Sequence, residues 1–337
     1  MILNETPVKT TNNYGINNIN FDIDLDNKLD KNINIESLDI DKLVIKKDNS
    51  KINSKIGLTA DSSKIEITIP KNKKLNDVYI KYTFDELSKI DEIKINLEEN
   101  SSARFYIIYK SKNNNKITNY LKQSVYAKEN SKANITIVNL LNNNSTNLIA
   151  IENKVKDYAN VYHNYIDLGA NVKITNYYSE LFNHSKSKLY NTYLGIKENI
   201  IDMNYHVKLY GEKSKCKIKV EGALKDKSKK SFKGTIDFIS GAKKSVGEEI
   251  ENCILLSDKA ISKSLPMLLC SEEDVEGSHG VSTGEIEKNK LFYIKSRGIS
   301  ENDAKKLIVL ANMNKVIKKI KNEEIEKEII DFINERI

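Results

Sequence analysis

Apolar and polar residues alternate in short runs through the middle of this chain. In residues 64–69, Lys-Ile-Glu-Ile-Thr-Ile, every second position is an isoleucine. The same spacing returns in four further pairs of apolar residues: Phe105 with Ile107, Ile135 with Ile137, Val172 with Ile174, and Ile218 with Val220. Period-two alternation is typical of a strand with one buried face. The pattern therefore predicts a β-core over residues 36–284, preceded by an Asn-rich N-terminal arm over residues 1–35.

Similar turns precede these runs. Residues 99–105, Glu-Asn-Ser-Ser-Ala-Arg-Phe, resemble residues 129–135, Glu-Asn-Ser-Lys-Ala-Asn-Ile. Looser copies begin at Leu168, Gly211 and Ser240. Because asparagine and glycine tolerate left-handed backbone, they suit tight corners between strands. Recurrence of one strand-plus-turn unit indicates a solenoid.

Two mainly-β architectures are compatible with this pattern, a sandwich and a β-helix. A sandwich needs many hairpin turns of the Asn-Gly or Asp-Gly type, and neither dipeptide occurs in the chain, which also has few glycines and only three prolines. A β-helix stacks coils, and asparagines at its corners can hydrogen-bond from coil to coil. The sequence therefore favours a right-handed parallel β-helix.

The pattern changes to helical near residue 285. A first helix is expected over residues 288–296, where Gly298 would stop it, and Ser300 with Asp303 forms a capping box for a second helix. A third helix is expected from about Asn322. Two apolar stripes are expected to face the core: Ala304, Leu307, Ile308 and Ala311, then Ile325, Ile329, Phe332 and Ile333. Residues 285–337 would form a helical domain too small to stand alone, which we expect to dock on the β-core or on a partner.

Composition narrows the class of protein. The chain has 337 residues, 39% of them hydrophobic and 30% charged, which indicates a globular protein without a membrane helix. Three cysteines without CxxC spacing argue against a disulfide framework or structural zinc, and the N-terminus does not resemble a secretion signal, so we expect a cytoplasmic location. The net charge of +7 comes from lysines spread along the chain, so no nucleic-acid partner is expected.

Standard enzyme motifs are missing from the sequence. It has no GxGxxG, no phosphate-binding GxxxxGK[ST], no HExxH and no GxSxG. Three of the four histidines, His163, His184 and His206, lie in Tyr- or Asn-rich strands and are interpreted as structural. The 17 tyrosines are likewise interpreted as strand residues.

His279 differs from the other histidines because it lies in a small-residue segment, Ser278-His279-Gly280, where the β-region ends. Imidazole is a suitable ligand for iron, and the thiolate of Cys253 in the preceding strand region would be a soft second ligand. The alternative is a turn histidine and a buried apolar cysteine. From the residues alone, both interpretations stay open.

Residues 231–311 resemble the C-terminal signature of the SufB/SufD family of iron–sulfur assembly scaffolds. The resemblance runs in order through Ser231-Phe232-Lys233-Gly234, 255–260 (Leu-Leu-Ser-Asp-Lys-Ala), Ser278-His279-Gly280 and 296–300 (Ser-Arg-Gly-Ile-Ser). Residues 6–11 also resemble the Pro-x-x-Thr-Trp entry of SufD-type chains, with Thr11 in place of the tryptophan. The resemblance implies a β-helix core and C-terminal helices, here from Leu291 to Ile320, that dock the ABC-type ATPase SufC.

The same resemblance implies the paralogue. SufB-type chains carry a functional cysteine 28 residues before the histidine and a glutamate directly after it, and here these positions are Glu251 and Gly280, which makes the chain SufD-like. SufD-type chains usually have a cysteine two residues before the histidine, where this chain has Gly277. Cys253 lies on the same strand face as Glu251 by period two and could substitute as a ligand, with simple burial as the alternative.

A non-catalytic scaffold is therefore expected, with His279, Cys253 and Glu251 as candidate ligands for iron or a nascent iron–sulfur cluster. The implied partners are a SufB-like paralogue at the β-helix edge and a SufC-like ATPase at the C-terminal helices. The expected interface residues are Ser278, Gly280, Phe292, Tyr293, Arg297 and Gly298. Two alternatives are a SufB-like scaffold that forms homodimers and a carbohydrate-binding β-helix protein.

Overall fold

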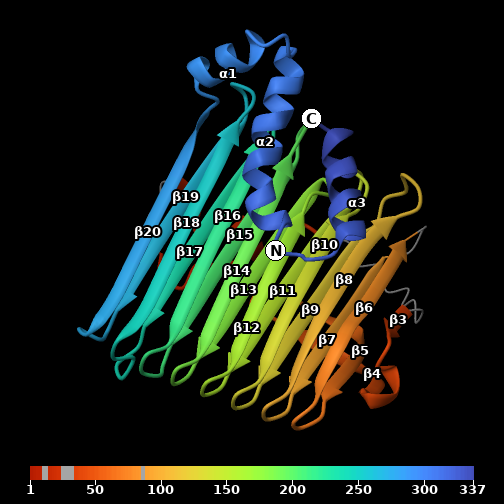
Figure 1. The fold of residues 1–337 in the computed structure, drawn as a ribbon, viewed down its shortest axis with the longest axis vertical. Coiled ribbons are helices and arrows are strands. Elements are labelled where there is room, and N and C mark those ends of the chain that lie inside the picture. The colour runs from red at the N-terminus through yellow and green to blue at the C-terminus, as the bar shows by residue number, and fades with distance from the viewer. Residues whose placement is uncertain (10–13, 24–33, 85–87) are drawn as a thin grey trace.

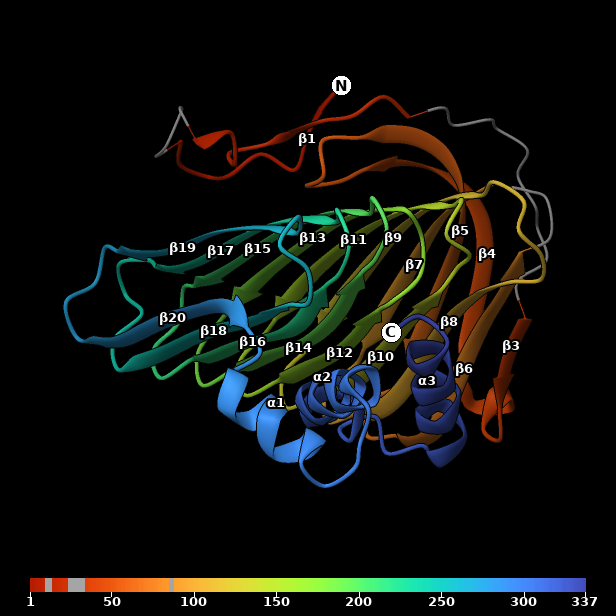
Figure 2. The same ribbon diagram turned by 90° about the horizontal axis from the view of Figure 1, so that it is seen from above.

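Two parallel β-sheets that face each other make up most of the protein (Figures 1 and 2). The computed structural model describes residues 1–9, 14–23, 34–84 and 88–337. Within these residues, successive strands from β5 to β20 alternate between an odd sheet and an even sheet, and neighbours in each sheet run parallel. The prediction of a parallel β-helix is confirmed.

Each sheet of the solenoid ends in one antiparallel strand near the N-terminal side, β3 in the even sheet and β4 in the odd sheet. The even sheet contains β3 (Asn34–Ser37), β6 (Lys74–Phe84), β8 (Ser102–Ser111), β10 (Lys132–Leu140), β12 (Asn160–Asp167), β14 (Lys186–Gly195), β16 (Lys215–Leu224), β18 (Ser245–Leu255) and β20 (Val275–Glu285). The odd sheet contains β4 (Val44–Asn53), β5 (Thr59–Ile69), β7 (Lys89–Leu97), β9 (Thr118–Ala127), β11 (Thr146–Val155), β13 (Val172–Leu181), β15 (Ile200–Leu209), β17 (Lys229–Phe238) and β19 (Ile261–Cys270). A short 3-10 turn, η2 (Ile40–Lys42), precedes β4.

The repeated turns of the sequence are the corners between coils. Asn100 and Asn130 have φ of +56° and +57°, as the turn pattern requires, and the Asn100 N–H donates to the Glu129 carbonyl of the next coil at 3.1 Å. At Gly211 a Cβ would lie 2.1 Å from the backbone nitrogen of Asn183, so only glycine allows the coils to approach this closely. The turn chemistry therefore sets the stacking distance as well as the chain reversal.

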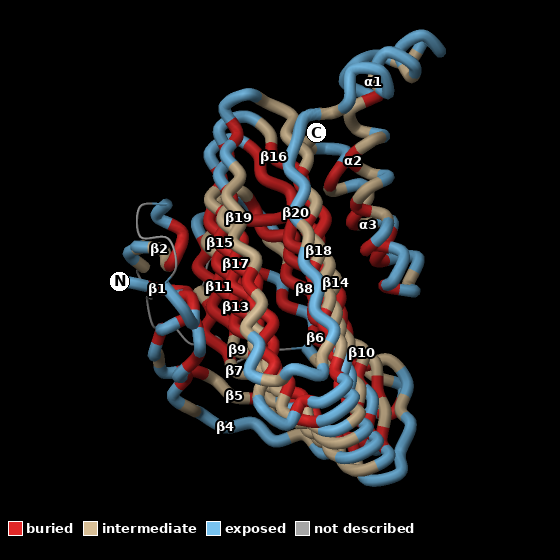
Figure 3. Tube along the Cα trace, turned by 90° about the vertical axis from the view of Figure 1, so that its left-hand side faces the viewer, coloured by how far each residue is buried: buried red, intermediate tan, exposed pale blue. Residues whose placement is uncertain are grey.

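Buried residues recur along the strands of both sheets (Figure 3). The inward residue of each alternating pair fills the space between the sheets. Ile65, Ile67 and Ile69 are 0–1% exposed, as their spacing predicts. Tyrosines also fill this core: Tyr82 stacks on Tyr109 with ring centroids 4.8 Å apart. Alternation along the strands therefore decides which residues are inside.

Three helices follow β20: α1 (Lys288–Lys295), α2 (Glu301–Ile317) and α3 (Glu323–Asn334). The Ser300 side chain accepts from the Asp303 N–H at 3.1 Å and Gly298 has φ +85°, which confirms the predicted cap and stop. Helices α2 and α3 pack on the outer face of the even sheet against a second apolar cluster that includes Val138, Ile166 and Leu194 (Figure 2). None of the described helices is long and apolar enough to cross a bilayer.

The predicted apolar stripe of α2 is partly wrong. Ala304 is buried, but Leu307 is 48% exposed and Ala311 is also exposed. The buried residues are Ala304, Val309, Met313, Val316 and Ile317. The reason is that α2 has two possible apolar stripes, and contact with the outer face of the even sheet selects the second.

The N-terminal arm lies on the outer face of the odd sheet, where β1 (Ile2–Leu3) and β2 (Ile19–Asn20) pair antiparallel (Figure 2). Asn4 is fully buried and donates to Asp202 at 2.5 Å, and Asp202 also accepts from Lys233 at 2.6 Å. Thr11, the position that resembles a family tryptophan, lies outside the described residues.

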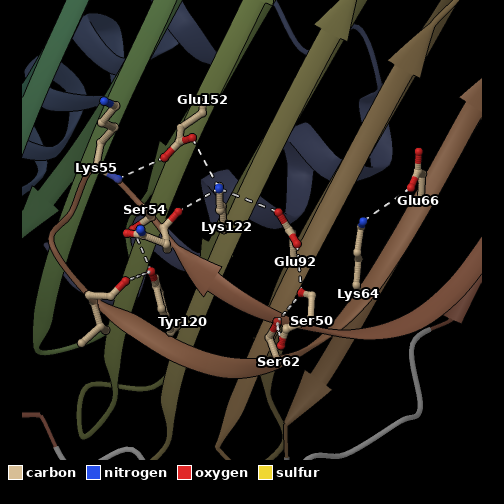
Figure 4. A network of polar contacts seen from close by, with 12 residues as sticks. Ser50, Ser54, Lys55, Ser62, Lys64, Glu66, Glu92, Tyr120, Lys122 and Glu152 are labelled. Atoms are coloured by element: carbon tan, nitrogen blue, oxygen red, sulfur yellow. Dashed lines mark hydrogen bonds and ion pairs between the residues drawn. The ribbon is translucent and has the colours of Figure 1, made fainter.

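The loop after β4 also lies over the outer face of the odd sheet (Figure 4). The Ser54 and Tyr120 hydroxyls are 2.7 Å apart, and the Lys122 ammonium donates to the Asn53 carbonyl at 2.9 Å. Glu152 accepts from the Lys55 backbone N–H at 3.0 Å and lies 3.5 Å from Lys122. Polar contacts therefore fix this segment to the sheet.

Candidate functional site

His279 lies on β20, the last strand of the even sheet, at an open end of the solenoid (Figures 1 and 3). It is exposed and in register with Glu249 of β18. A Cβ on Gly277 would touch the interior rings and methyls of Phe238 and Leu268 at 3.2 and 3.3 Å, whereas one on Gly280 would meet nothing within 4 Å. Because side chains alternate along a strand, His279 shares the inward face with Gly277 and completes the interior at its open end.

Glu251 is fully buried and forms an ion pair with Lys230, which is also fully buried. Its carboxylate additionally accepts from the Ser264 hydroxyl at 2.6 Å and the Tyr193 hydroxyl at 3.2 Å. Lys230 also donates to Ser264 at 2.9 Å. These donors come from both sheets, so the carboxylate is fully engaged and would have to leave the ammonium group of Lys230 to bind a metal ion.

Cys253 is 3% exposed and faces inward with Glu251, as the period-two argument predicts. Burial raises the pKa of its thiol. A raised pKa favours the neutral thiol, whereas the thiolate is the form that binds iron. The positive charge of Lys230 opposes this shift in pKa but does not outweigh burial, so Cys253 resembles a packed core residue in this chain.

Glu249 is a residue of this site that the sequence interpretation missed. It is fully buried, and neither of its carboxylate oxygens has a hydrogen-bond partner among the described residues. Its carboxylate occupies the space where Gly234 lacks a side chain, since a Cβ there would lie 1.9 Å from Oε1. Burial and the negative charge of Glu251 raise the pKa of Glu249 to about 8. The available signal was the inward row Glu249, Glu251 and Cys253, where strand alternation places two acids in a core.

The structure does not bring the predicted ligands together as a closed site. Within the described ranges, no three His, Cys, Asp or Glu side chains lie in an arrangement that could hold a metal ion. His279 and Glu249 share one inward row, with Glu251 and Cys253 further along β18. The chain alone thus presents a partial set of donors at the open end.

The predicted interface residues lie around this end. Ser278 is exposed on β20, and Phe292 and Tyr293 on α1 are 74% and 61% exposed. Arg297 covers the Tyr293 ring at 5.3 Å from its centroid. Among the described strands, none pairs with the outer edge of β19 or β20. The end of the solenoid therefore offers two unpaired backbone edges beside exposed aromatic side chains.

The other three histidines occupy packed positions. His163 is fully buried at 3.2 Å from Gln123, and burial lowers its pKa to about 3. His184 stacks on Tyr158 at a corner, and His206 lies 3.5 Å from Asp237 on the outer face of the odd sheet. These packed positions suit the structural interpretation.

Comparison with known proteins gives the family. Residues 82–312, more than half of the chain, match the family described as SUF system FeS cluster assembly, SufBD core domain. The chain is 29% identical over 128 residues to the iron–sulfur cluster assembly protein SufD of Bacillus subtilis, which is 38% of this chain and 29% of that protein.

Two further relatives agree with this match. SufD of Escherichia coli is 29% identical over 114 residues, which is 34% of this chain and 27% of that protein. A SufBD family protein of Pyrococcus horikoshii is 34% identical over 127 residues, or 38% of this chain and 28% of that protein. The matched part thus spans under a third of each relative's length. The chain belongs to the SufBD family of SUF-system iron–sulfur cluster assembly proteins.

Proposed function

We propose that the protein is a SufD-like scaffold subunit that acts in the cytoplasm and pairs with a SufB-like paralogue. The observation that carries the proposal is the incomplete inward row at the open end, where His279 is exposed beside buried Glu249 and a second solenoid could cover it. Pairing along β19 and β20 would also satisfy the unpaired backbone groups of these strands. The iron or nascent cluster is the cargo of this shared site.

In this proposal the donors have different roles. His279 offers imidazole to iron because it is exposed and lies on the inward face. Glu251 positions Lys230 and Ser264 beside the site, since its carboxylate is already paired. Cys253 would become a ligand only if its thiol lost a proton when the partner closes the site. The chemistry of sulfur delivery then belongs mainly to the paralogue, because Glu251 stands where SufB-type chains have their functional cysteine.

We further propose that residues 285–337 dock a SufC-like ATPase. Helix α1 buries none of its residues on the solenoid, and Phe292 and Tyr293 are exposed on it. Exposed aromatic residues beside an arginine are the usual anchors of a protein interface. The chain has no phosphate-binding loop, so ATP hydrolysis would take place on the partner.

The pairing can be tested by co-expressing the chain with SufB- and SufC-type proteins and measuring the mass of the purified complex. We expect one complex that contains all three chains. Phe292→Ala/Tyr293→Ala should release the ATPase and leave the paralogue bound, whereas Tyr158→Ala, which truncates a 50% exposed tyrosine at a distant corner, should change nothing. A stable complex of two copies of this chain with the ATPase, without the paralogue, would instead support the SufB-like alternative.

The site can be tested by measuring iron retained in the purified complex. His279→Ala should lower the iron content with the complex intact, because the imidazole ligand is lost. His184→Ala removes a partly exposed histidine at a corner of the solenoid and serves as the matched control. Equal iron in both variants would exclude His279 as a ligand.

A further inference from the structure

A second surface, on the outer face of the even sheet, gathers positive charge. In the even sheet Lys132 of β10 is in register with Asn160 of β12, then with Lys186 of β14 and Lys215 of β16. Two residues further along these strands, Lys188 of β14 is in register with Tyr162 of β12. Register partners on neighbouring parallel strands of this sheet lie 26 to 31 residues apart in the sequence, as from Asn160 to Lys186 and from Lys215 to Val246. The lysines are therefore dispersed along the chain but lie close together on the sheet.

These lysines face outward. The residues between them, including Ala133, Ser187 and Cys216, are buried in the interior of the solenoid. Helices α2 and α3 cover the second half of the strands, where Val138, Ile166 and Leu194 join the second apolar cluster. The first half of each strand stays uncovered beside the helices (Figure 1). Lys319, which follows α2, borders this uncovered area and lies 4.3 Å from the centre of the Tyr190 ring on β14.

We call Lys132, Lys186, Lys188, Lys215 and Lys319 the lysine stripe. Within the described part of the chain, none of its members forms an ion pair. Two neighbours on β16 are different: Lys217 binds Glu248 at 2.7 Å and Lys219 lies 3.3 Å from Glu221. Burial and the positive charges of Lys219, Lys188 and Lys217 lower the pKa of Lys319. The stripe is therefore a concentration of uncompensated positive charge.

Tyrosine rings contact three members of the stripe, Lys132, Lys188 and Lys319. The ammonium groups of Lys132 and Lys188, one from each neighbouring strand, lie 5.9 and 5.1 Å from the centre of the Tyr162 ring. Such contacts orient the lysines, and they also occupy the ring. Nucleic-acid bases bind a sheet by stacking on free aromatic faces, which these rings do not offer. Carboxylates need only the ammonium groups, so the arrangement favours an acidic polypeptide.

One end of the stripe opens into a groove of about 800 Å³ between β3 and the outer face of the even sheet. Its lining includes the cations Lys132 and Arg104 and the acids Glu36 and Asp77, and Arg104 lies 3.3 Å from Asp77. The groove thus carries no excess of positive charge, and the lysine stripe ends at Lys132 on its rim. A bound acidic segment would therefore cross the strands from Lys132 toward Lys215 without entering the groove.

We propose that the lysine stripe docks an extended acidic segment of a partner protein. The three strand steps from β10 to β16 span about 14 Å, which four or five extended residues can follow. Carboxylates of such a segment would pair with the ammonium groups of Lys132, Lys186 and Lys215, and would pass Asn160 of β12 between the first two. No member of the stripe lies on β20 or α1, so the inference stands independently of the proposed scaffold pairing.

The experiment measures binding of a fluorescein-labelled decaglutamate peptide to the full chain by anisotropy at low salt. Lys132→Gln/Lys188→Gln/Lys215→Gln should weaken binding about tenfold, which corresponds to about 1.4 kcal/mol, and added salt should weaken wild-type binding further. The matched control removes the same charge from β4, where Lys46, Lys47 and Lys51 are all exposed: Lys46→Gln/Lys47→Gln/Lys51→Gln should bind like the wild type.

If the two triple variants lose peptide affinity equally, the inference is overturned, because the net charge of the chain alone would then explain binding. Absence of peptide binding to the wild-type chain would overturn it as well. A labelled single-stranded oligouridine of ten nucleotides provides the remaining comparison. If it binds more tightly than the peptide and the stripe variant alone loses it, the partner is a nucleic acid and the acidic-polypeptide assignment is wrong.

Discussion

Replacing Lys230 by methionine should destabilise the solenoid strongly, because it leaves the Glu251 carboxylate without its cation. Both side chains are 0% exposed, and the Lys230 ammonium also donates to Ser264 at 2.9 Å and to the Lys263 carbonyl at 3.2 Å. A second buried carboxylate, Glu249, lies on the same face of β18. Loss of the ammonium would leave two acids in one low-dielectric interior.

Removing one partner of a buried ion pair costs about 3–5 kcal/mol. The entropy of unfolding is about 2.1 cal/mol/K per residue near 60 °C, or roughly 0.7 kcal/mol/K for a chain of 337 residues. We therefore expect Lys230→Met to lower the Tm by about 4–7 °C. Thermal unfolding followed by circular dichroism at pH 7 and fixed protein concentration measures this shift.

Two control variants separate the buried charge from other effects. Lys227→Met breaks an exposed pair with Glu198, whose side chains are 62% and 75% exposed, and should change the Tm by no more than about 1.5 °C. Lys230→Met/Glu251→Leu replaces the whole pair by apolar groups and should recover most of the loss. The reasoning fails if Lys230→Met behaves like Lys227→Met, or if the double variant is as unstable as the single one.

Three further outcomes follow from buried groups and close contacts. Because the pKa of Glu249 is raised to about 8 in the folded state, the native protein prefers its protonated form and loses stability as the pH rises from about 4.5 to 8. The Tm of Glu249→Gln should therefore exceed that of the wild type by a margin that grows from pH 5 to pH 8, and a constant margin would contradict this. Gly211→Ala should lower the Tm because its Cβ would lie 2.1 Å from the Asn183 backbone nitrogen, whereas Gly280→Ala, with nothing within 4 Å, should leave the Tm within about 1 °C. Met313→Ala should lower the free energy of unfolding by about 2–5 kcal/mol, since this fully buried side chain joins α2 to the even sheet. Faster cleavage of the helices in limited proteolysis would show this loss.

The parallel β-helix could be predicted because its determinants are local. Alternation fixes the inward face of each strand, as at Ile65, Ile67 and Ile69, and the Asn-containing turns place the corners at Asn100 and Asn130. The caps of α2 could be read for the same reason, since Ser300 bonds a residue three positions away. The inward face of Cys253 and Glu251 followed from the same period-two rule.

The buried side of α2 could not be predicted in the same way. Both Leu307 and Val309 are apolar, and helix geometry permits either to face a core. Val309 is buried because Leu194 and Ile166 of distant strands form the surface beneath it. Nothing near α2 in the sequence contains this information.

The sequence by itself determined the coil, its corners and the family, because strand alternation and turn conformation depend on neighbouring residues. Tertiary structure decided which charges meet. Lys230 faces Glu251 from the other sheet, Glu249 fills the space left by Gly234, and the lysines of three strands align on one surface. The physical reason is that the register between coils joins residues about 30 positions apart, and electrostatic energies depend on those distances in space and on burial.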